Sequence, residues 1–252
     1  MFELSCWNAD VYKSEYIFWK VLLISIDPLE INNTFKTFYS DLYTSAFPHD
    51  ISNMTIFFEN LDIPRIDGDA KDNLDKPIQL QEIVDSIKQM QTGKICGPDG
   101  YPMEFYKKFS TQLAPILLEM FNHSFSQKNL PLSLTEASIS LILKPGKDPL
   151  ECGSYRPISL LNADVKILAK LPGSRLDNVV SQVISMDQTG FMRGRHSFTN
   201  IRKLLNVLHS PASRGIPEVV VSLDAEKAFD RIEWGYLFAV LEKFGFGPTF
   251  IS

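Results

Sequence analysis

The chain has 252 residues, of which 44% are hydrophobic and 22% are charged, and its formal net charge is −5. This composition is typical of a globular protein and excludes a disordered or collagen-like chain. Cys6, Cys96 and Cys152 are far apart and form no CxxC pair, so we expect no disulfide framework and an intracellular protein that is not secreted. The apolar run from Ile17 to Ile26 contains Lys20 and is shorter than the roughly 20 residues that span a bilayer, so we expect no membrane segment.

Apolar residues at helical spacing predict four helices in the first half of the chain, over about residues 28–44, 80–90, 102–110 and 113–127. Residues 48–76 are rich in Asn, Asp, Pro and Gly and predict a linker. Gly97 to Gly100 reads Gly-Pro-Asp-Gly, which predicts a turn between the second and third helices. No structure is assigned to residues 1–26.

Strands and helices are interleaved in the second half. We predict strands over residues 137–143 and 218–223, and helices over 161–171, 197–209 and 234–244. A Pro-Gly turn flanked by Lys144 and Lys147 ends the first strand and leaves a short basic hairpin tip. Pro172 and Gly173 should end or kink the first of these helices. Helices followed by interleaved strands and helices indicate an α+β fold.

The charges of the chain are unevenly distributed. Residues 140–215 contain eleven Lys and Arg residues against five Asp and Glu residues, a net charge of +6, so the remainder of the chain carries −11. A basic segment between acidic flanks is a candidate phosphate-binding surface, and a merely solvated basic surface is the alternative.

The segment from Val219 to Asp230 reads VVVSLDAEKAFD. An apolar strand that ends in Asp224 could project a carboxylate into a cleft, where Mg²⁺ is held by a few carboxylates together with water and substrate phosphates. The alternative is that Asp224 only caps the strand or the turn. Asp230 could also cap the helix that follows.

This segment resembles the first catalytic motif of the reverse transcriptases of non-LTR retrotransposons. The resemblance continues upstream through four further blocks in the family's order, at residues 92–109, 136–148, 154–162 and 187–195. These blocks include Gly97-Pro98-Asp99-Gly100, Leu143-Lys144-Pro145-Gly146-Lys147-Asp148, Ser154-Tyr155-Arg156-Pro157-Ile158-Ser159-Leu160-Leu161-Asn162 and Asp187-Gln188-Thr189-Gly190-Phe191 with Gly194-Arg195. The resemblance covers about residues 80–246, and five ordered motifs are far more specific than any one of them.

The resemblance implies the fingers and part of the palm of a right-hand polymerase, truncated, with a helical N-terminal extension. The implied organisation is an unassigned segment at 1–26, a linker and helical segment at 27–78, and a partial reverse transcriptase domain at 79–252. The implied partners are an RNA template, a DNA primer and deoxynucleoside triphosphates. The parent family works in the cytoplasm and the nucleus.

The resemblance also assigns roles to residues. Asp224 would bind both Mg²⁺ ions of a two-metal nucleotidyl transfer, and the carbonyl oxygen of Ala225 would be a second ligand. Phe229 would lie under the incoming sugar as a steric gate against a 2′-hydroxyl, and a core aromatic is the alternative. Arg156 would contact the triphosphate, because its planar guanidinium suits phosphate oxygens.

Four further basic residues are candidates for contacts with substrate. Lys144 and Lys147 would contact the triphosphate or the template backbone. Arg193 and Arg195 would contact template phosphate, and a solvated surface is the alternative for both.

The family also uses a second pair of carboxylates in an aromatic-x-Asp-Asp hairpin, and these 252 residues contain no Asp-Asp dipeptide. One carboxylate cannot hold two Mg²⁺ ions, so we expect that the isolated chain does not polymerise DNA. We also expect an uncovered, aggregation-prone strand at Val219–Leu223. The alternatives are a non-catalytic RNA-binding module that uses residues 140–215 and a translated remnant with no function or stable fold.

Overall fold

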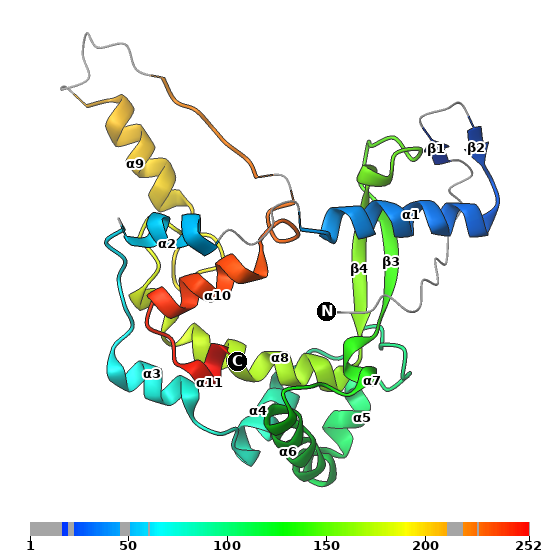
Figure 1. The fold of residues 1–252 in the computed structure, drawn as a ribbon, viewed down its shortest axis with the longest axis horizontal. Coiled ribbons are helices and arrows are strands. Elements are labelled where there is room, and N and C mark those ends of the chain that lie inside the picture. Colours follow the sequence, from blue (N-terminus) through cyan, green and yellow to red (C-terminus); the bar gives the residue numbers. More distant parts are fainter. Residues whose placement is uncertain are drawn as a thin grey trace. The chain divides into compact units, whose positions relative to one another are not determined.

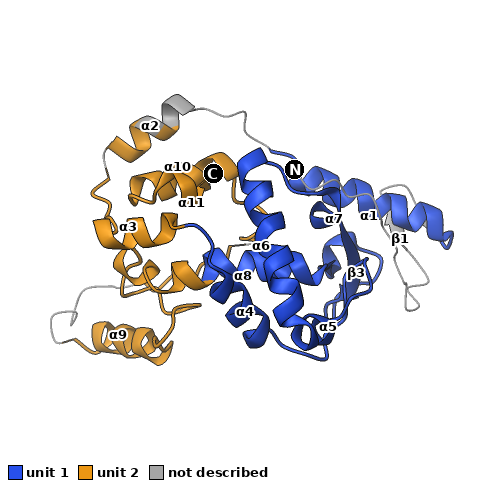
Figure 2. Ribbon diagram, turned by 90° about the horizontal axis from the view of Figure 1, so that it is seen from below, with its two compact units in different colours: residues 1–46, 77–173 blue, residues 47–76, 174–252 orange. Residues whose placement is uncertain are grey.

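The computed structural model describes residues 17–19, 23–45, 51–59, 61–210, 219–225 and 227–251, so Cys6, Glu218 and Glu226 lie outside these ranges. The described residues form helices and two small antiparallel sheets, which confirms a mixed fold of helices and strands. The chain divides into two compact units (Figure 2). Unit 1 comprises residues 1–46 and 77–173, and unit 2 comprises residues 47–76 and 174–252. The domain boundaries predicted after residues 26 and 78 stay predictions.

Helices form most of unit 1. They are α1 (Pro28–Tyr43), α4 (Leu80–Gln89), α5 (Met103–Lys108), α6 (Ser110–Gln127), α7 (Leu132–Thr135) and most of α8 (Ala163–Asp177). The four helices predicted before residue 128 are therefore confirmed, with ends shifted by a few residues. At the start of α4, the backbone N–H of Gln79 donates to Glu82 Oε2 at 2.8 Å and satisfies one of the donors that a helix start leaves without a partner.

The larger core of unit 1 is helical. Its fully or nearly buried residues come from α4, α5, α6 and α8, and they are Ile83, Ile87, Met103, Tyr106, Ala114, Leu117, Phe121, Ala163, Ile167 and Leu171. Helices α4 and α6 pack directly against each other. The apolar spacing that predicts these helices is therefore also the spacing that buries them.

Strands β3 (Ala137–Leu143) and β4 (Tyr155–Leu161) lie side by side as an antiparallel hairpin (Figure 1). Ala137 pairs with Leu161 at one end, and Leu143 pairs with Tyr155 at the other. The predicted strand over 137–143 is confirmed, and the turn that follows includes a 3-10 helix at Cys152–Ser154. A second, three-residue pair joins β1 (Ile17–Trp19) and β2 (Leu23–Ser25), within the segment to which the sequence assigned no structure.

Helix α1 packs on the β3–β4 hairpin through aromatic side chains. Phe35 and Tyr155 are both buried, and their rings meet edge to face with centroids 5.1 Å apart. The hydroxyl of Tyr155 donates to the carbonyl of Pro149 at 3.0 Å, and Tyr39 from α1 completes the cluster. Tyr155 of the motif therefore serves packing, whereas Ile158 is 41% exposed.

The Gly97–Gly100 turn is fixed by Asn162, the residue between β4 and α8. The buried Asn162 side chain accepts from the backbone N–H of Asp99 at 3.2 Å and donates to the carbonyl of Ser133 at 2.9 Å. A Cβ atom at Gly97 would overlap Asn162 and the carbonyl carbon of Leu161. The turn between α4 and α5 is therefore packed against the end of the hairpin, and its first position requires glycine.

Unit 2 contains α2 (Ile51–Glu59), α3 (Gly68–Asp75), α9 (Phe198–Leu208), α10 (Trp234–Lys243), α11 (Pro248–Ile251) and a 3-10 helix at Val180–Gln182. Its core joins α3 to the segment after α8 and to the C-terminal helices through Ile66, Ala70, Leu74, Val179, Val183 and Phe246. Side chains reinforce these contacts, since Gln182 Nε2 donates to Asp67 Oδ2 at 2.9 Å and Asp75 Oδ1 accepts from the N–H of Phe250 at 2.8 Å.

Two predictions of local structure are wrong. The predicted linker at 48–76 contains α2 and α3, and α3 begins where Asp67 accepts from the N–H of Ala70 at 2.7 Å. The helix predicted over 161–171 continues through Pro172 to Asp177, so its predicted end is wrong, whereas a kink at Pro172 and Gly173 stays a prediction. Both errors have one physical origin, because packing against residues far away in the sequence overrides a local propensity of about 1–3 kcal/mol.

Candidate functional site

Asp224 lies in an exposed, extended segment of unit 2. Residues 219–225 form no strand in the part of the chain that the structure describes, and Figure 1 shows them as an orange trace. The strand predicted over residues 218–223 is therefore wrong for the described residues 219–223, of which Val219 is 85% exposed and Leu223 is 90% exposed. A strand requires a neighbour to pair its backbone groups, and no described residue supplies one here. The expectation of an uncovered apolar segment is confirmed.

The turn after Asp224 presents Phe229. The N–H groups of Asp230 and Arg231 both donate to the carbonyl of Lys227, at 2.9 Å and 3.1 Å. Phe229 is 83% exposed, so the alternative that it is a core aromatic is wrong. Its ring meets the ring of Phe191 edge to face, with centroids 6.0 Å apart.

The described residues do not form a complete metal site. Among them, no three His, Cys, Asp or Glu side chains lie close enough together to hold a metal ion. Asp224 is exposed, and with the Ala225 carbonyl it offers two oxygen ligands of the kind that Mg²⁺ prefers. These two groups would supply only part of the coordination of a Mg²⁺ ion.

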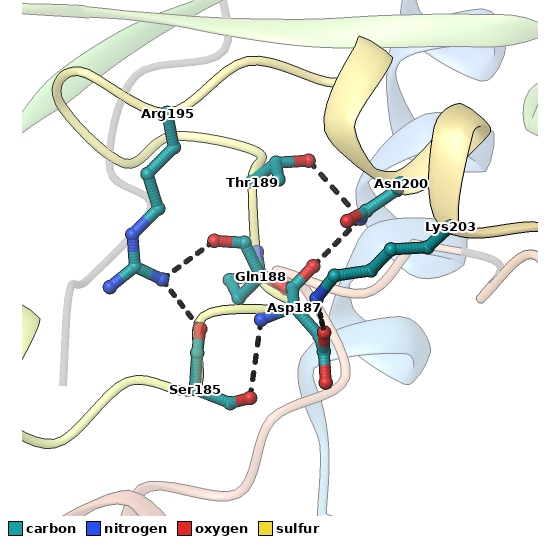
Figure 3. A network of polar contacts seen from close by, with 7 residues as sticks. All are labelled: Ser185, Asp187, Gln188, Thr189, Arg195, Asn200 and Lys203. Carbon is teal, nitrogen blue, oxygen red and sulfur yellow. Dashed lines mark hydrogen bonds and ion pairs between the residues drawn. The ribbon is translucent and has the colours of Figure 1, made fainter. Parts of the chain in front are cut away.

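Arg195 is held inside the loop that precedes α9 (Figure 3). Its guanidinium donates to the carbonyl oxygens of Ser185, Gln188 at 2.9 Å and Ile184 at 3.2 Å. Arg195 therefore joins both ends of the loop. The contact of Arg195 with template phosphate stays a prediction. In this structure the guanidinium donates hydrogen bonds to three backbone carbonyls.

Helix α9 fixes the same loop from its other side (Figure 3). Asn200 Nδ2 donates to the carbonyl of Asp187 at 2.7 Å, and Lys203 forms an ion pair with the Asp187 carboxylate. The hydrogen bond from Lys203 lowers the pKa of Asp187 below its ordinary value. Arg193 lies on the outside of the loop, with its side chain 86% exposed and Nη1 3.9 Å from Asp177 Oδ2.

Three candidate residues belong to the β3–β4 hairpin of unit 1. Lys144 Nζ donates to the carbonyl of Gly153 at 2.9 Å, which ties the two sides of the hairpin turn together. Lys147 is exposed at the tip. Arg156 is exposed on β4, where it pairs in register with Ile142.

The candidate residues therefore form two sets. Lys144, Lys147 and Arg156 belong to unit 1, and the unit 2 set comprises Arg193, Arg195, Asp224, Ala225 and Phe229. The contact between Phe191 and Phe229 was missed at the sequence level, because 37 residues separate the two rings along the chain. A pocket elsewhere on unit 2 contains no predicted site residue and is lined by Phe58, Glu59, Leu61, Asp62, Ile63, Arg65 and Lys243.

Comparison with known proteins identifies the class of protein. The family model for reverse transcriptase (RNA-dependent DNA polymerase) matches residues 142–252, which include the hairpin arginine, the loop before α9 and Asp224. These residues therefore belong to a reverse transcriptase domain. None of the described helices combines the length and apolar character needed to cross a membrane.

Curated relatives identify the particular group within that class. The chain is 35% identical over 90% of its length to the uncharacterised 149 kDa protein of transposon TX1 from Xenopus laevis. It is 29% identical over 62% of its length to a probable RNA-directed DNA polymerase from transposon BS of Drosophila melanogaster, and 28% identical over 62% to that of the mobile element jockey of Drosophila funebris. The chain belongs to the reverse transcriptase family of non-LTR retrotransposons. It spans 17% or 18% of the length of these three relatives.

Proposed function

We propose that this chain supplies the fingers and the first part of the palm of an RNA-directed DNA polymerase. The observation that carries the proposal is the segment from Asp224 to Phe229, which lies within the family match and exposes both the carboxylate and the aromatic ring. In this proposal the β3–β4 hairpin belongs to the fingers, and Asp224 is the first palm carboxylate.

Each proposed role rests on the chemistry of one side chain. The exposed guanidinium of Arg156 would bind triphosphate oxygens with its planar set of donors. Phe229 would contact the deoxyribose, where an aromatic ring leaves no room for a 2′-hydroxyl. Lys144 has three ammonium protons, so its bond to Gly153 leaves donors for a phosphate group.

Asp224 and the Ala225 carbonyl would hold part of the Mg²⁺ coordination that the family uses. When bound, the ions would activate the primer hydroxyl and stabilise the leaving pyrophosphate. The 252 residues contain no Asp-Asp dipeptide and supply one of the carboxylate motifs that this chemistry needs. We therefore propose that a polypeptide of these residues alone does not extend a primer.

Primer extension on an RNA template with Mg²⁺ and deoxynucleotides tests the proposed inactivity. The expected result for the purified 252-residue chain is no extended product. Extension that disappears in the Asp224→Ala variant would show that these residues suffice for polymerisation and would overturn this part of the proposal.

The sugar-gate role of Phe229 needs a polypeptide that carries the other carboxylates. A fusion of this chain with the part of the jockey RNA-directed DNA polymerase of Drosophila funebris that follows its matched segment is designed to supply them, because that relative is named for this activity. In that fusion, Phe229→Val should admit ribonucleotides while deoxynucleotide incorporation continues, and Phe125→Val in α6 is the matched control. Unchanged ribonucleotide exclusion in Phe229→Val would remove the gate role.

A second candidate function is binding of RNA without catalysis. The net charge of +6 over residues 140–215 favours it, because neutralisation of phosphates dominates protein affinity for nucleic acid. The affinity for RNA should then fall steeply as the salt concentration rises. An absence of RNA binding at low salt would exclude this second function.

A further inference from the structure

Phe191 combines a strained backbone with an exposed ring. Its φ angle is +60°, in the left-handed region that residues with a Cβ atom rarely adopt, and its side chain is 95% exposed. Lys128 also has a positive φ, which the end of α6 explains, but Phe191 ends none of the described helices. Neither core packing nor helix capping accounts for this conformation.

Side-chain hydrogen bonds hold the loop that contains Phe191 on both sides of this residue. Arg195 joins the carbonyls of Ile184, Ser185 and Gln188, and Asn200 holds Asp187 from α9 (Figure 3). Strained residues persist where surrounding contacts determine them, and such residues gather at ligand-binding sites. The loop therefore fixes the direction in which the ring is presented.

One aromatic ring lies beside Phe191, and further aromatic and cationic residues follow it along the chain. The Phe229 ring lies 6.0 Å away, and His196 stacks on the exposed Phe198 at 6.0 Å between centroids. Arg193 and Arg202 are exposed in the same stretch of chain. Aromatic faces interleaved with arginines suit single-stranded nucleic acid, because rings stack on unpaired bases and guanidinium groups bind the adjacent phosphates.

We propose that Phe191 stacks on an unpaired base of a single-stranded nucleic acid, with Arg193 binding the adjacent phosphate. This inference rests on the proposed function, because a template strand is the natural ligand at a surface that includes the sugar-gate Phe229. Arg195 is then a positioning residue, which acts by holding the loop and does not itself bind phosphate.

The test is the affinity of the full 252-residue chain for a fluorescently labelled single-stranded RNA, measured by anisotropy without Mg²⁺. Phe191→Ala should weaken binding by about fivefold to about a hundredfold, the effect of losing one stacked base. Phe191→Trp should bind like the wild type, because it restores an aromatic face. The matched control is Phe125→Ala, which removes an exposed ring from α6 and should leave the affinity unchanged.

The form of the RNA and the salt concentration separate stacking from charge. An abasic strand and an RNA duplex offer no unpaired base, so Phe191→Ala should bind both as the wild type does. Arg193→Ala should reduce the slope of log affinity against log salt by about 1, and Phe191→Ala should leave that slope unchanged.

A double-mutant cycle tests the positioning role of Arg195. Arg195→Ala should weaken binding of the base-containing strand in the wild-type background and have little effect in the Phe191→Ala background. Equal effects in both backgrounds would mean that Arg195 binds the RNA itself.

Two results would overturn the stacking proposal. One is a wild-type chain that fails to bind the RNA at low salt, and the other is a Phe191→Ala variant that binds with wild-type affinity. These outcomes are separate from failure of the polymerase proposal. If the fusion extends primers but Phe191→Ala leaves the RNA affinity unchanged, only the polymerase proposal stands. If the fusion is inactive but Phe191→Ala weakens RNA binding, only the stacking proposal stands.

Discussion

Helix α8 of unit 1 and helix α9 of unit 2 both carry apolar residues at helical spacing, but they differ in burial. Ile167 in α8 is 0% exposed and lies in the core with α4 and α6, whereas Ile201 in α9 is 59% exposed. None of the residues of α9 is buried, and Val219–Leu223 is exposed as well. An amphipathic pattern therefore predicts a helix but does not identify the surface that covers it.

Hydrogen exchange tests this difference in burial over the largest part of the chain. Backbone amides in α4, α6 and the buried part of α8 should exchange orders of magnitude more slowly than those of 219–225, with α9 between them, because protection follows buried packing. Mass spectrometry of peptides from the intact chain gives the rates. Uniformly fast exchange across residues 80–240 would contradict the account and favour a remnant without a stable fold.

Matched isoleucine substitutions sharpen the comparison at single residues. Ile167→Ala should destabilise unit 1 by about 2–5 kcal/mol, since it leaves a cavity in a closed core. Ile201→Ala should change the free energy of unfolding by less than about 0.5 kcal/mol, because its side chain is largely exposed. Denaturant titration measures both values, and a comparable cost at the two positions would mean that α9 is covered.

Glycine substitutions test whether the turn at Gly97 is as closely packed as the unit 1 core. Gly97→Ala should cost about 1–3 kcal/mol, because its Cβ meets the backbone of Leu161 and Asn162. Gly173→Ala in α8 is the control, since a Cβ there meets open space and should stabilise the helix by about 0.5–1 kcal/mol. A neutral Gly97→Ala, by thermal or denaturant unfolding, would show that the turn is loosely held.

The pH dependence of stability should have opposite signs at two carboxylates, one in each unit. Burial, with a smaller contribution from Asp99, raises the pKa of Asp164, so the folded state loses stability as pH rises from the ordinary value of 3.8 through the raised pKa. Asp164→Asn keeps an acceptor for the N–H of Val165 and should be the more stable protein at neutral pH. Lys203 lowers the pKa of Asp187, so the stability that this pair contributes is present above 3.8 and is lost as pH falls through the lowered pKa.

Denaturation of the two Asn variants across the acid range measures these effects, which are the smallest of the set. Asp187→Asn should lose a little stability at neutral pH, because its carboxylate is exposed and the ion pair is screened by solvent. Identical pH profiles for the two variants would contradict the assigned environments.

Local sequence signals predicted those parts of the fold that depend on local interactions. The apolar spacing of Leu80, Ile83 and Ile87 predicts α4, and the Pro-Gly turn after Leu143 predicts the hairpin. Helix α3 carried a signal that could have been used, since Asp67 is a good N-cap and Ile66, Ala70 and Leu74 recur every four residues.

Other features depend on contacts that no local pattern contains. The apolar run Val219–Leu223 has the composition of a strand, but a strand forms only where a neighbour pairs with it. Arginine is a residue type that commonly binds phosphate, and only the three-dimensional structure shows that the Arg195 guanidinium donates hydrogen bonds to backbone carbonyls. The contact between Phe191 and Phe229 likewise needed the fold to bring its two rings together.

The most direct test of the central claim is primer extension by the fusion of this chain with the following part of the jockey RNA-directed DNA polymerase. We expect RNA-templated DNA synthesis that Asp224→Asn reduces by several orders of magnitude, with Asp72→Asn in α3 as an exposed carboxylate control that leaves the rate unchanged. Synthesis that continues undiminished in the Asp224→Asn fusion would contradict the account, because Asp224 would then be only an exposed carboxylate in an extended segment.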